Sequence, residues 1–224
     1  MRGTRGRRLS RAGVLAIAMA LAASTVALAA APASGQPAHG HRVTYFKFGI
    51  DLTAHTQPAN AGNDSCHFSD SHLTGDPCTR MAMISGDVDA AGGHMQAPMS
   101  GVITKIKLIA GHKGSMSPWV AKITHWTQGD HTGDGQATAH GPVINYASSV
   151  TSGTTYTVQS FPVHIDVRKG EYLGIRAKKT SMLRCTQGSV TQLLFQPPLV
   201  VGDPPTANGG IDDCVLLIEA FGHT

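Results

Sequence analysis

Charged and aromatic residues are both scarce in this chain of 224 residues: 14% of its residues are charged and 5% are aromatic. Hydrophobic residues make up 41% of the chain, a share that is ordinary for a globular protein and too high for an intrinsically disordered one. Glycine shows no regular period, which excludes a collagen-like structure. The length is sufficient for one substantial hydrophobic core.

Basic residues are scarce outside the N-terminal segment. The formal net charge is +4, but five arginines lie within the first eleven residues: Arg2, Arg5, Arg7, Arg8 and Arg11. The remainder contains 13 basic and 14 acidic residues and is therefore nearly neutral. A nearly neutral chain without a basic stripe offers little to phosphate groups, so we expect no nucleic-acid partner.

Only one long hydrophobic run is present, and it follows the arginine-rich segment. Val14–Ala31 contains two polar residues, Ser24 and Thr25, and small residues follow it. This order of basic, apolar and small-residue regions is typical of a secretory signal peptide, and Ala27-Leu28-Ala29 is one of two sites that fit the A-x-A cleavage rule. We predict a signal peptide over residues 1–31, a flexible N-terminal segment over 32–41 and a secreted, extracellular protein.

Two alternatives to ordinary secretion concern the same segment. An uncleaved membrane anchor is disfavoured because alanine, which dominates the run, contributes little transfer free energy. The pair Arg7-Arg8 is compatible with twin-arginine export, but the polar and basic residues Ser10 and Arg11 follow it, which favours the general route. With no second run of this length, we expect no membrane span in the mature chain.

Cysteine is sparse, and all four cysteines follow the predicted signal peptide: Cys66, Cys78, Cys185 and Cys214. An even number of cysteines in an exported protein predicts two disulfide bonds. Four cysteines allow three pairings, of which the short spacing favours Cys66 with Cys78 and Cys185 with Cys214. A structural zinc site is the alternative, but no C-x₂-C pair occurs.

Helical periodicity is missing, whereas period-two alternation is frequent. In Thr154–Ile165 the alternation changes phase, which predicts a bulge near Ser160–Pro162. The predicted strands are Arg42–Leu52, Val102–Ile109, Pro118–Trp126, Val143–Ala147, Thr154–Ile165, Tyr172–Lys178, Ser189–Phe195 and Asp213–Phe221.

About eight strands, with no helices to cover a parallel sheet, predict an all-β fold: an antiparallel two-sheet β-sandwich. We place it in a single domain over residues 42–224 and favour a jelly roll over an immunoglobulin-like sandwich, because the Cys-Trp-Cys spacing of the latter is not met. We expect the irregular stretch 53–98 to be a long loop, stapled by a disulfide, that covers a sheet edge. A ligand-contacting loop is the alternative.

Three segments carry a resemblance to known proteins: GVITKIKL, WVAKITHW and FPVHIDVRKGEYLGIRA. A strand that opens after a small-residue turn, and a later alternating strand that leads through a Lys-Gly-Glu turn into Leu-Gly-Ile, resemble uncharacterised secreted bacterial β-sandwich proteins with jelly-roll-like folds. The resemblance covers residues 97–178. It implies the fold and export, and no catalytic residues.

Histidine is abundant, with 12 residues, so metal binding is a competing interpretation. Zinc, copper or calcium ligands are candidates in the glycine-rich stretch TQGDHTGDGQATAHG and the preceding strand: His125, Asp130, His131, Asp134 and His140. No H-E-x-x-H or EF-hand pattern supports the site, and such stretches are mostly turns. His125 also shares the parity of the core residues before it, so a hydrogen-bonded histidine at the core margin is the alternative.

Two further metal candidates are weaker. His39 and His41 lie just after the predicted cleavage site, where a free terminal amine could join them as a copper ligand, although a mobile polar tail is the alternative. Asp87, Asp89 and His94 surround a Gly-Gly pair and offer oxygen and nitrogen ligands.

Signals for catalysis are missing. No G-x-S-x-G elbow occurs, no acidic pair is placed as a recognisable acid and base, and we predict no catalytic residue. Trp126, of opposite parity to Trp119, is a candidate ligand-binding platform for carbohydrate, with Tyr45, Tyr146 and Tyr172 as further rings and core packing as the alternative for Trp126.

The sequence therefore predicts a secreted, disulfide-stabilised β-sandwich that acts without catalysis as an extracellular or cell-surface binding or structural module. We expect no obligatory cofactor, and a partner that is an extracellular ligand or cell-surface component of unknown identity. The alternatives are a metal-binding protein or metal-dependent enzyme that uses the histidine-rich loop, and a carbohydrate-binding module.

Overall fold

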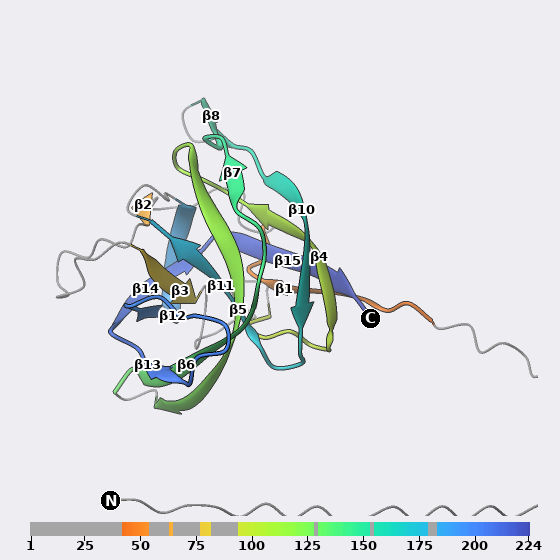
Figure 1. Cartoon of the computed structure of the whole chain (residues 1–224). Coiled ribbons are helices and arrows are strands. Elements are labelled where there is room, and N and C mark those ends of the chain that lie inside the picture. The colour runs from red at the N-terminus through yellow and green to blue at the C-terminus, as the bar shows by residue number, and fades with distance from the viewer. Residues whose placement is uncertain are drawn as a thin grey trace, which may run out of the picture. The chain divides into compact units, whose positions relative to one another are not determined.

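The computed structural model describes residues 42–53, 63–64, 77–81, 94–127, 130–152, 155–178 and 183–224 (Figure 1). These ranges lie within one compact unit, His41–Thr224. None of the described residues is helical, and so no described segment is a helix that could cross a membrane. The strands are β1 (Tyr45–Gly49), β2 (Asn63–Asp64), β3 (Cys78–Met81), β4 (Gly101–Leu108), β5 (Gly114–Thr127), β6 (Thr132–His140), β7 (Ile144–Tyr146), β8 (Val150–Ser152), β9 (Thr155–Tyr156), β10 (Gln159–Val167), β11 (Tyr172–Ala177), β12 (Leu183–Phe195), β13 (Thr206–Ala207), β14 (Gly210–Leu216) and β15 (Ile218–His223).

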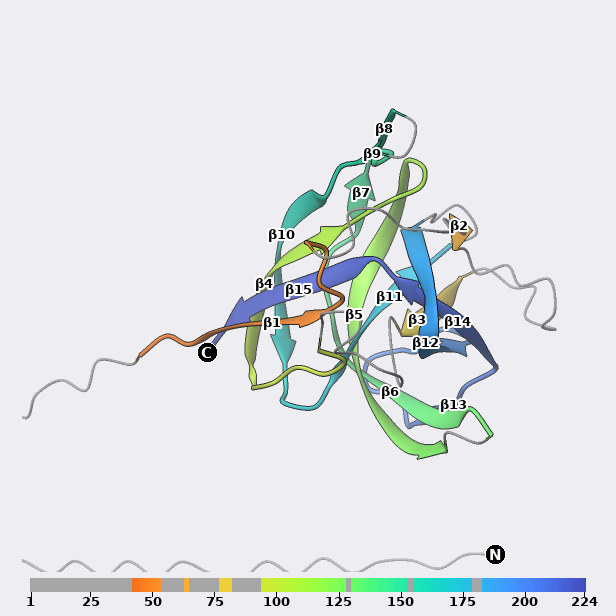
Figure 2. The same ribbon diagram turned by 180° about the vertical axis from the view of Figure 1, so that it is seen from behind.

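The strands form two main antiparallel sheets. A four-stranded sheet has the order β1-β15-β4-β10, and a nine-stranded sheet has the order β13-β6-β5-β11-β3-β12-β14, with β2 on β12 and β7 on β5. β8 and β9 form a small hairpin between β7 and β10. Figure 2 shows the chain passing from β14 into β15, and so from the larger sheet into the smaller one. The prediction of an all-β, antiparallel fold is confirmed.

One buried hydrophobic cluster contains side chains from both main sheets. Phe48 and Ile106 belong to the four-stranded sheet, whereas Val120 and Leu173 belong to the nine-stranded sheet, and each is at most 1% exposed. The strands of the four-stranded sheet alternate because the face toward this cluster must be buried and the other face can meet water. Burial of apolar surface in this cluster is the main term that stabilises the fold.

The nine-stranded sheet is also buried on its second face. There Trp119 and Phe195 pack with Leu199, which comes from the segment after β12. The backbone N–H of Leu199 donates to Oγ1 of buried Thr79 at 3.0 Å, which anchors that segment to β3. A third buried cluster, built around Ile50 and Leu217, lies beyond the ends of β1 and β14.

Each predicted strand overlaps a strand of the structure. On β5 the predicted faces are confirmed only in part: Trp119 is buried and Lys122 is exposed, but Val120, which shares the parity of Lys122, is fully buried because both faces of β5 are covered there. The predicted irregularity near Ser160–Pro162 is confirmed as a shift in the β4–β10 register that begins at Pro162. The β4–β15 register also shifts, between Phe221 and Gly222, and Ile103 of β4 is fully buried at this point.

The glycine-rich stretch after β5 is a strand and not the predicted turn. β6 pairs along β5, and alternate residues of β6 are buried: Gly133, Gly135 and Ala137. A Cβ atom at Gly135 would lie 2.5 Å from Cζ of Phe195, so the space that a side chain would need is already filled. Clustered glycine usually indicates a turn, whereas in β6 it permits close packing of a strand against the core.

The predicted loop over 53–98 also contains a strand. All four residues of β3 are buried between β11 and β12, and Arg80 is fully buried with its Nε donating to Gln192 Oε1 at 3.2 Å. The polar residues of β3 concealed it from the hydrophobic pattern. Near the end of the predicted loop, His94 and Gln96 form isolated bridges with Gly49 and Tyr172.

The cysteines are described only in part. Cys78 is buried and disulfide-bonded, and the partner is outside the residues whose side chains the structure describes. The β12–β14 register places Cys185 opposite Leu216 and Cys214 opposite Gln187, so these two cysteines are diagonal neighbours on adjacent strands. Cys66 lies outside the described residues, and the pairing of the four stays a prediction.

Candidate functional site

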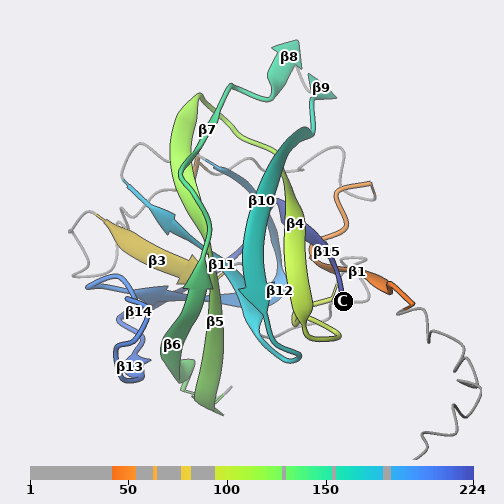
Figure 3. The ribbon, with the colours of Figure 1, turned by 45° about the vertical axis from the view of Figure 1, so that its right-hand side comes forward.

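The outer face of the four-stranded sheet gathers lysines and aromatic rings. Across its four strands, Lys47 of β1 pairs with Phe221 of β15, which pairs with Lys105 of β4, which pairs with Pro162 of β10. Directly opposite residues in a sheet share a face, so these four side chains form one row. Figure 3 shows β4 and β10 side by side at this part of the molecule.

Phe221 stands at the centre of the row and contacts two ammonium groups. The Nζ atoms of Lys105 and Lys107 lie 4.4 Å and 4.6 Å from the centroid of its ring. Such cation–π contacts hold a lysine in place for about 0.5–1 kcal/mol without neutralising its charge. Within the described ranges, no carboxylate lies at ion-pair distance from either lysine. Lys107 is opposite Glu219 in the β4–β15 register and its charge acts on that carboxylate. Lys105 is opposite Phe221 and Pro162 instead, so its charge is the one offered most directly to an anionic ligand.

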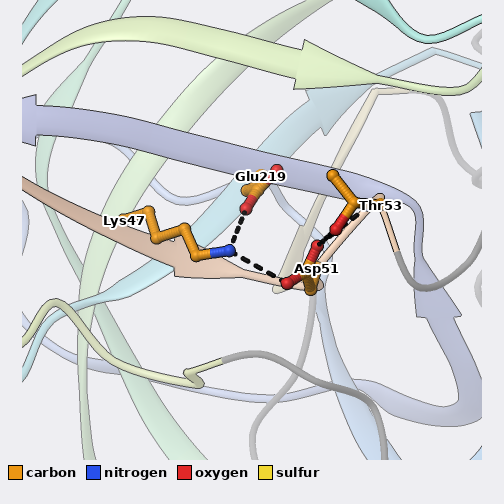
Figure 4. Close-up of polar contacts among 4 residues, drawn as sticks. All are labelled: Lys47, Asp51, Thr53 and Glu219. Atoms are coloured by element: carbon orange, nitrogen blue, oxygen red, sulfur yellow. Dashed lines mark hydrogen bonds and ion pairs between the residues drawn. The ribbon is translucent and has the colours of Figure 1, made fainter.

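Lys47, by contrast, forms ion pairs with two carboxylates on its own face. Its Nζ donates to Asp51 Oδ2 at 2.9 Å and lies 3.3 Å from Glu219 Oε1 (Figure 4). Asp51 also accepts hydrogen bonds from the hydroxyl and the backbone N–H of Thr53. The hydroxyl of Thr53 is the main cause that lowers the pKa of Asp51, followed by Lys47. The hydrogen bond to Asp51 raises the pKa of Lys47.

Glu219 differs from Asp51 because it is buried. Its side chain is 3% exposed, and among the described residues its Oε2 atom has no hydrogen-bond partner. Burial raises the pKa of Glu219, although the charges of Lys47 and Lys107 oppose the shift. The two carboxylates thus have pKa values displaced in opposite directions, and the cluster fixes Lys47 at the edge of the row.

An open groove of about 490 Å³ lies beside Lys105 and Phe221. Phe46 reaches the groove because its neighbour on β15 is Gly222, where a Cβ atom would lie 2.5 Å from Phe46 Cζ. Tyr45, 78% exposed, stands at its edge with its ring centroid 6.0 Å from that of His223. The lining residues are Tyr45, Phe46, Thr104, Lys105, Ser160, Pro162, Phe221 and Gly222.

The residues predicted as metal ligands do not converge. His125 Nδ1 lies 2.9 Å from Asp134 Oδ2, but the His125 side chain is 83% exposed, and no third ligand among the described residues joins the pair. The rings of His131 and His140 lie instead against Trp126 and Trp119. Over all described residues, no three His, Cys, Asp or Glu side chains form a group able to hold a metal ion. The exposed Asp130 is in no such group.

The predicted platform, Trp126, packs against the core. The register of β5 with β6 shifts between Thr124 and Thr127, and His125 has a positive φ of 53°. This irregularity reverses the alternation, so Trp126 joins the cluster of Trp119, whereas His125 points to solvent. The parity that placed His125 at the core margin and Trp126 outside is therefore wrong.

The remaining sequence candidates are scattered. Tyr146 is buried, and Tyr172 accepts a hydrogen bond from Gln96 Nε2 at 2.7 Å, so neither is an open platform. His94 is exposed and bridged to β1. The other residues of the two weaker metal candidates lie outside the described residues: His39, His41, Asp87 and Asp89.

Lys105, Lys107, Phe221 and Glu219 were not recognised as site residues from the sequence. Alternation alone could place both lysines on the polar face of their strand, but the ring that holds them comes from a strand more than one hundred residues later in the chain. Only the β4–β15 pairing brings these residues together.

Comparison with known proteins assigns this chain to no family. No family model, curated protein or solved structure matches the chain.

Proposed function

We propose that this protein is a secreted, non-catalytic binding module that binds acidic saccharides on the outer face of its four-stranded sheet. The observation that carries the proposal is the pair Lys105 and Lys107, held against Phe221 with no carboxylate at ion-pair distance in the described part of the chain. The hydrophobic run and small-residue sites near the N-terminus support export.

For the fold we infer a two-sheet β-sandwich of the jelly-roll type. The inference is supported by the buried cluster that the two main sheets share, in which Phe48 of one sheet packs with Leu173 of the other. A sandwich leaves the outer face of the four-stranded sheet, on which Lys47, Lys105 and Phe221 lie, directed away from this shared core.

The groove provides the groups that a saccharide with carboxylate or sulfate substituents requires. Lys105 supplies a cation inside the groove, and Lys107 supplies a second beside it. Ser160 and Thr104 supply hydroxyl groups that can pair with sugar hydroxyls, and Tyr45 supplies an exposed ring for a sugar face. Aromatic and hydroxyl groups together favour a saccharide over an acidic peptide as the ligand.

Binding is favoured over hydrolysis by the position of the nearby carboxylates. Asp51 is held by Lys47 and Thr53, and Glu219, which shares the outer face with Lys47 and Lys107, has a side chain that is 3% exposed. Neither lines the groove. A glycosidase requires two carboxyl groups on either side of the bond that is cleaved, and these two are not placed in that way.

The test is binding of the purified protein to arrayed acidic and neutral glycans, followed by titration calorimetry on the acidic glycans that bind. Replacing both Lys105 and Lys107 with alanine is expected to weaken binding about tenfold or more, as loss of charged hydrogen bonds does. The matched control replaces the exposed Lys113 and Lys122, which removes the same charge outside the groove, and is expected to leave affinity unchanged.

Added salt is expected to weaken binding, because it screens exposed charges. Replacing Tyr45 with alanine should weaken binding without changing this salt dependence. The proposal is overturned if neutral and acidic glycans bind equally well, if the control pair of substitutions has the same effect as the Lys105 and Lys107 pair, or if only acidic peptides bind.

A further inference from the structure

A second pocket, on the nine-stranded sheet, combines an arginine, a histidine and two exposed valines. It has a volume of about 280 Å³ and is lined by Ser117, Trp119, His140, Arg176, Val200 and Val201. The pocket shares no lining residue with the groove on the four-stranded sheet.

Three adjacent strands build one wall of this pocket. β11 pairs with β5 so that Arg176 is opposite Ser117, and β5 pairs with β6 so that Trp119 is opposite His140. The facing position on β11 is Gly174, which brings no side chain over Trp119. Arg176 and His140 can therefore both reach the indole of Trp119.

Trp119 lies between the two cationic or ionisable side chains. The His140 ring stacks on it with centroids 5.0 Å apart and an interplanar angle of 24°, and Arg176 Cζ lies 5.7 Å from the indole centroid. Trp119 is 4% exposed, and within the described ranges its Nε1 hydrogen has no acceptor. The indole contacts both side chains through its ring and accepts no hydrogen bond from either, so it occupies none of their donors.

Arg176 offers its guanidinium donors to the pocket. Among the described residues, its guanidinium has no carboxylate at ion-pair distance and no side-chain acceptor. His140 Nδ1 lies 3.1 Å from Gly141 O. A carbonyl oxygen can only accept, so Nδ1 carries the proton and donates; Nε2 then accepts in the neutral ring and donates to an anion only when the ring is protonated. The guanidinium fork matches the two oxygens of a carboxylate.

The opposite side of the pocket is apolar. Val200 and Val201 are 44% and 42% exposed, which is unusual for large aliphatic side chains placed side by side. The segment that carries them is held by buried Leu199 and by the hydrogen bond from Leu199 N–H to Thr79. The valines therefore form a fixed apolar surface that faces solvent.

We infer that this pocket binds a small organic acid with an apolar body, whose carboxylate pairs with Arg176 and whose hydrocarbon part covers Val200 and Val201. The pocket volume lies just below the range of about 300–1,000 Å³ that is typical for drug-sized ligands, which favours a compact acid over a larger ligand. Phosphate would satisfy Arg176 and leave the valines exposed.

The test is an NMR titration of the purified protein with hexanoate, acetate and inorganic phosphate. Hexanoate is expected to bind more tightly than acetate or phosphate, because only hexanoate uses both walls. Arg176→Lys keeps the charge but removes the fork, and is expected to weaken hexanoate binding about tenfold or more. Arg168→Lys is the matched control: Arg168 is exposed, lies outside the pocket and should leave binding unchanged.

A second variant keeps the test informative if a change at Arg176 disturbs the stack on Trp119. Val201→Asp alters an exposed position, so folding should be retained, and its charge should repel the carboxylate and weaken binding. The inference is overturned if acetate or phosphate binds as tightly as hexanoate, if Arg176→Lys and Val201→Asp both leave the affinity unchanged, or if hexanoate causes no saturable shifts up to about 10 mM.

Discussion

Gly135→Ala tests whether the glycine-rich stretch is a packed strand. A Cβ atom at Gly135 would lie 2.5 Å from Cζ and 2.7 Å from Cε1 of Phe195, and 3.0 Å from Cδ1 of Leu199. Carbon atoms in contact prefer separations of about 3.5–4.0 Å, so the methyl group would overlap the ring by roughly 1 Å. Phe195 is fully buried and Leu199 is 4% exposed, so neither can turn out into solvent.

The expected cost follows from overpacking. An added methyl group in a filled core costs about 1–3 kcal/mol. Replacing glycine with alanine also restricts the unfolded chain, which offsets about 0.4–1 kcal/mol of this cost. We therefore expect Gly135→Ala to lower the free energy of unfolding by about 1–2 kcal/mol and the Tm by roughly 2–8 °C for a chain of this size.

Urea denaturation monitored by tryptophan fluorescence measures this change, with Gly133→Ala as the matched control. Gly133 lies on the same face of β6, but its added Cβ atom would have its nearest neighbour, Leu193 Cδ1, at 3.1 Å, so a smaller loss is expected. In a mobile loop both substitutions would be neutral or slightly stabilising. Equal effects, or a gain in stability for Gly135→Ala, would refute the packed-strand interpretation.

Two further predictions concern Glu219 and the cysteines. The pKa of Glu219 is raised above its ordinary value of 4.5, so its contribution to stability is complete below pH 4.5 and is lost as the pH rises through the raised pKa. Urea unfolding measured across pH should show this decline for the native sequence, and Glu219→Gln should abolish it. The same pH profile in both proteins would contradict the prediction. Peptide mapping without reduction should find Cys66 linked to Cys78 and Cys185 linked to Cys214, and any other pairing would contradict the prediction.

Much of the fold could be predicted because period-two alternation survives wherever one face of a strand is buried. β1 follows this pattern, with Phe48 inside and Lys47 outside, whereas β5 follows it only in part because it is buried on both faces at Trp119 and Val120. β6 could not be found in this way, since glycine and alanine on its buried face carry no hydrophobic signal. The reason for their small size is visible only in the structure, where the ring of Phe195 fills the space that a side chain at Gly135 would need.

The candidate site was harder to predict, because it depends on pairing between distant segments. The metal interpretation counted His125, His131 and His140 along the chain, but two irregular positions with positive φ, His125 and His131, redirect these side chains. Alternation carries no information about such positions, where a single added residue reverses the face. The Lys105–Phe221 contact follows from the β4–β15 register, which sequence spacing cannot supply.

Both proposed binding sites use an aromatic ring to hold a cation that has no carboxylate at ion-pair distance in the described part of the chain. Phe221 positions Lys105 and Lys107, and Trp119 positions Arg176. A carboxylate would hold these cations more firmly but would also neutralise them, as Asp51 does for Lys47. A ring restrains the long side chain and leaves its charge in place. The side chain therefore loses less conformational entropy when the ligand binds. This arrangement favours anion binding at both sites by the same physical means.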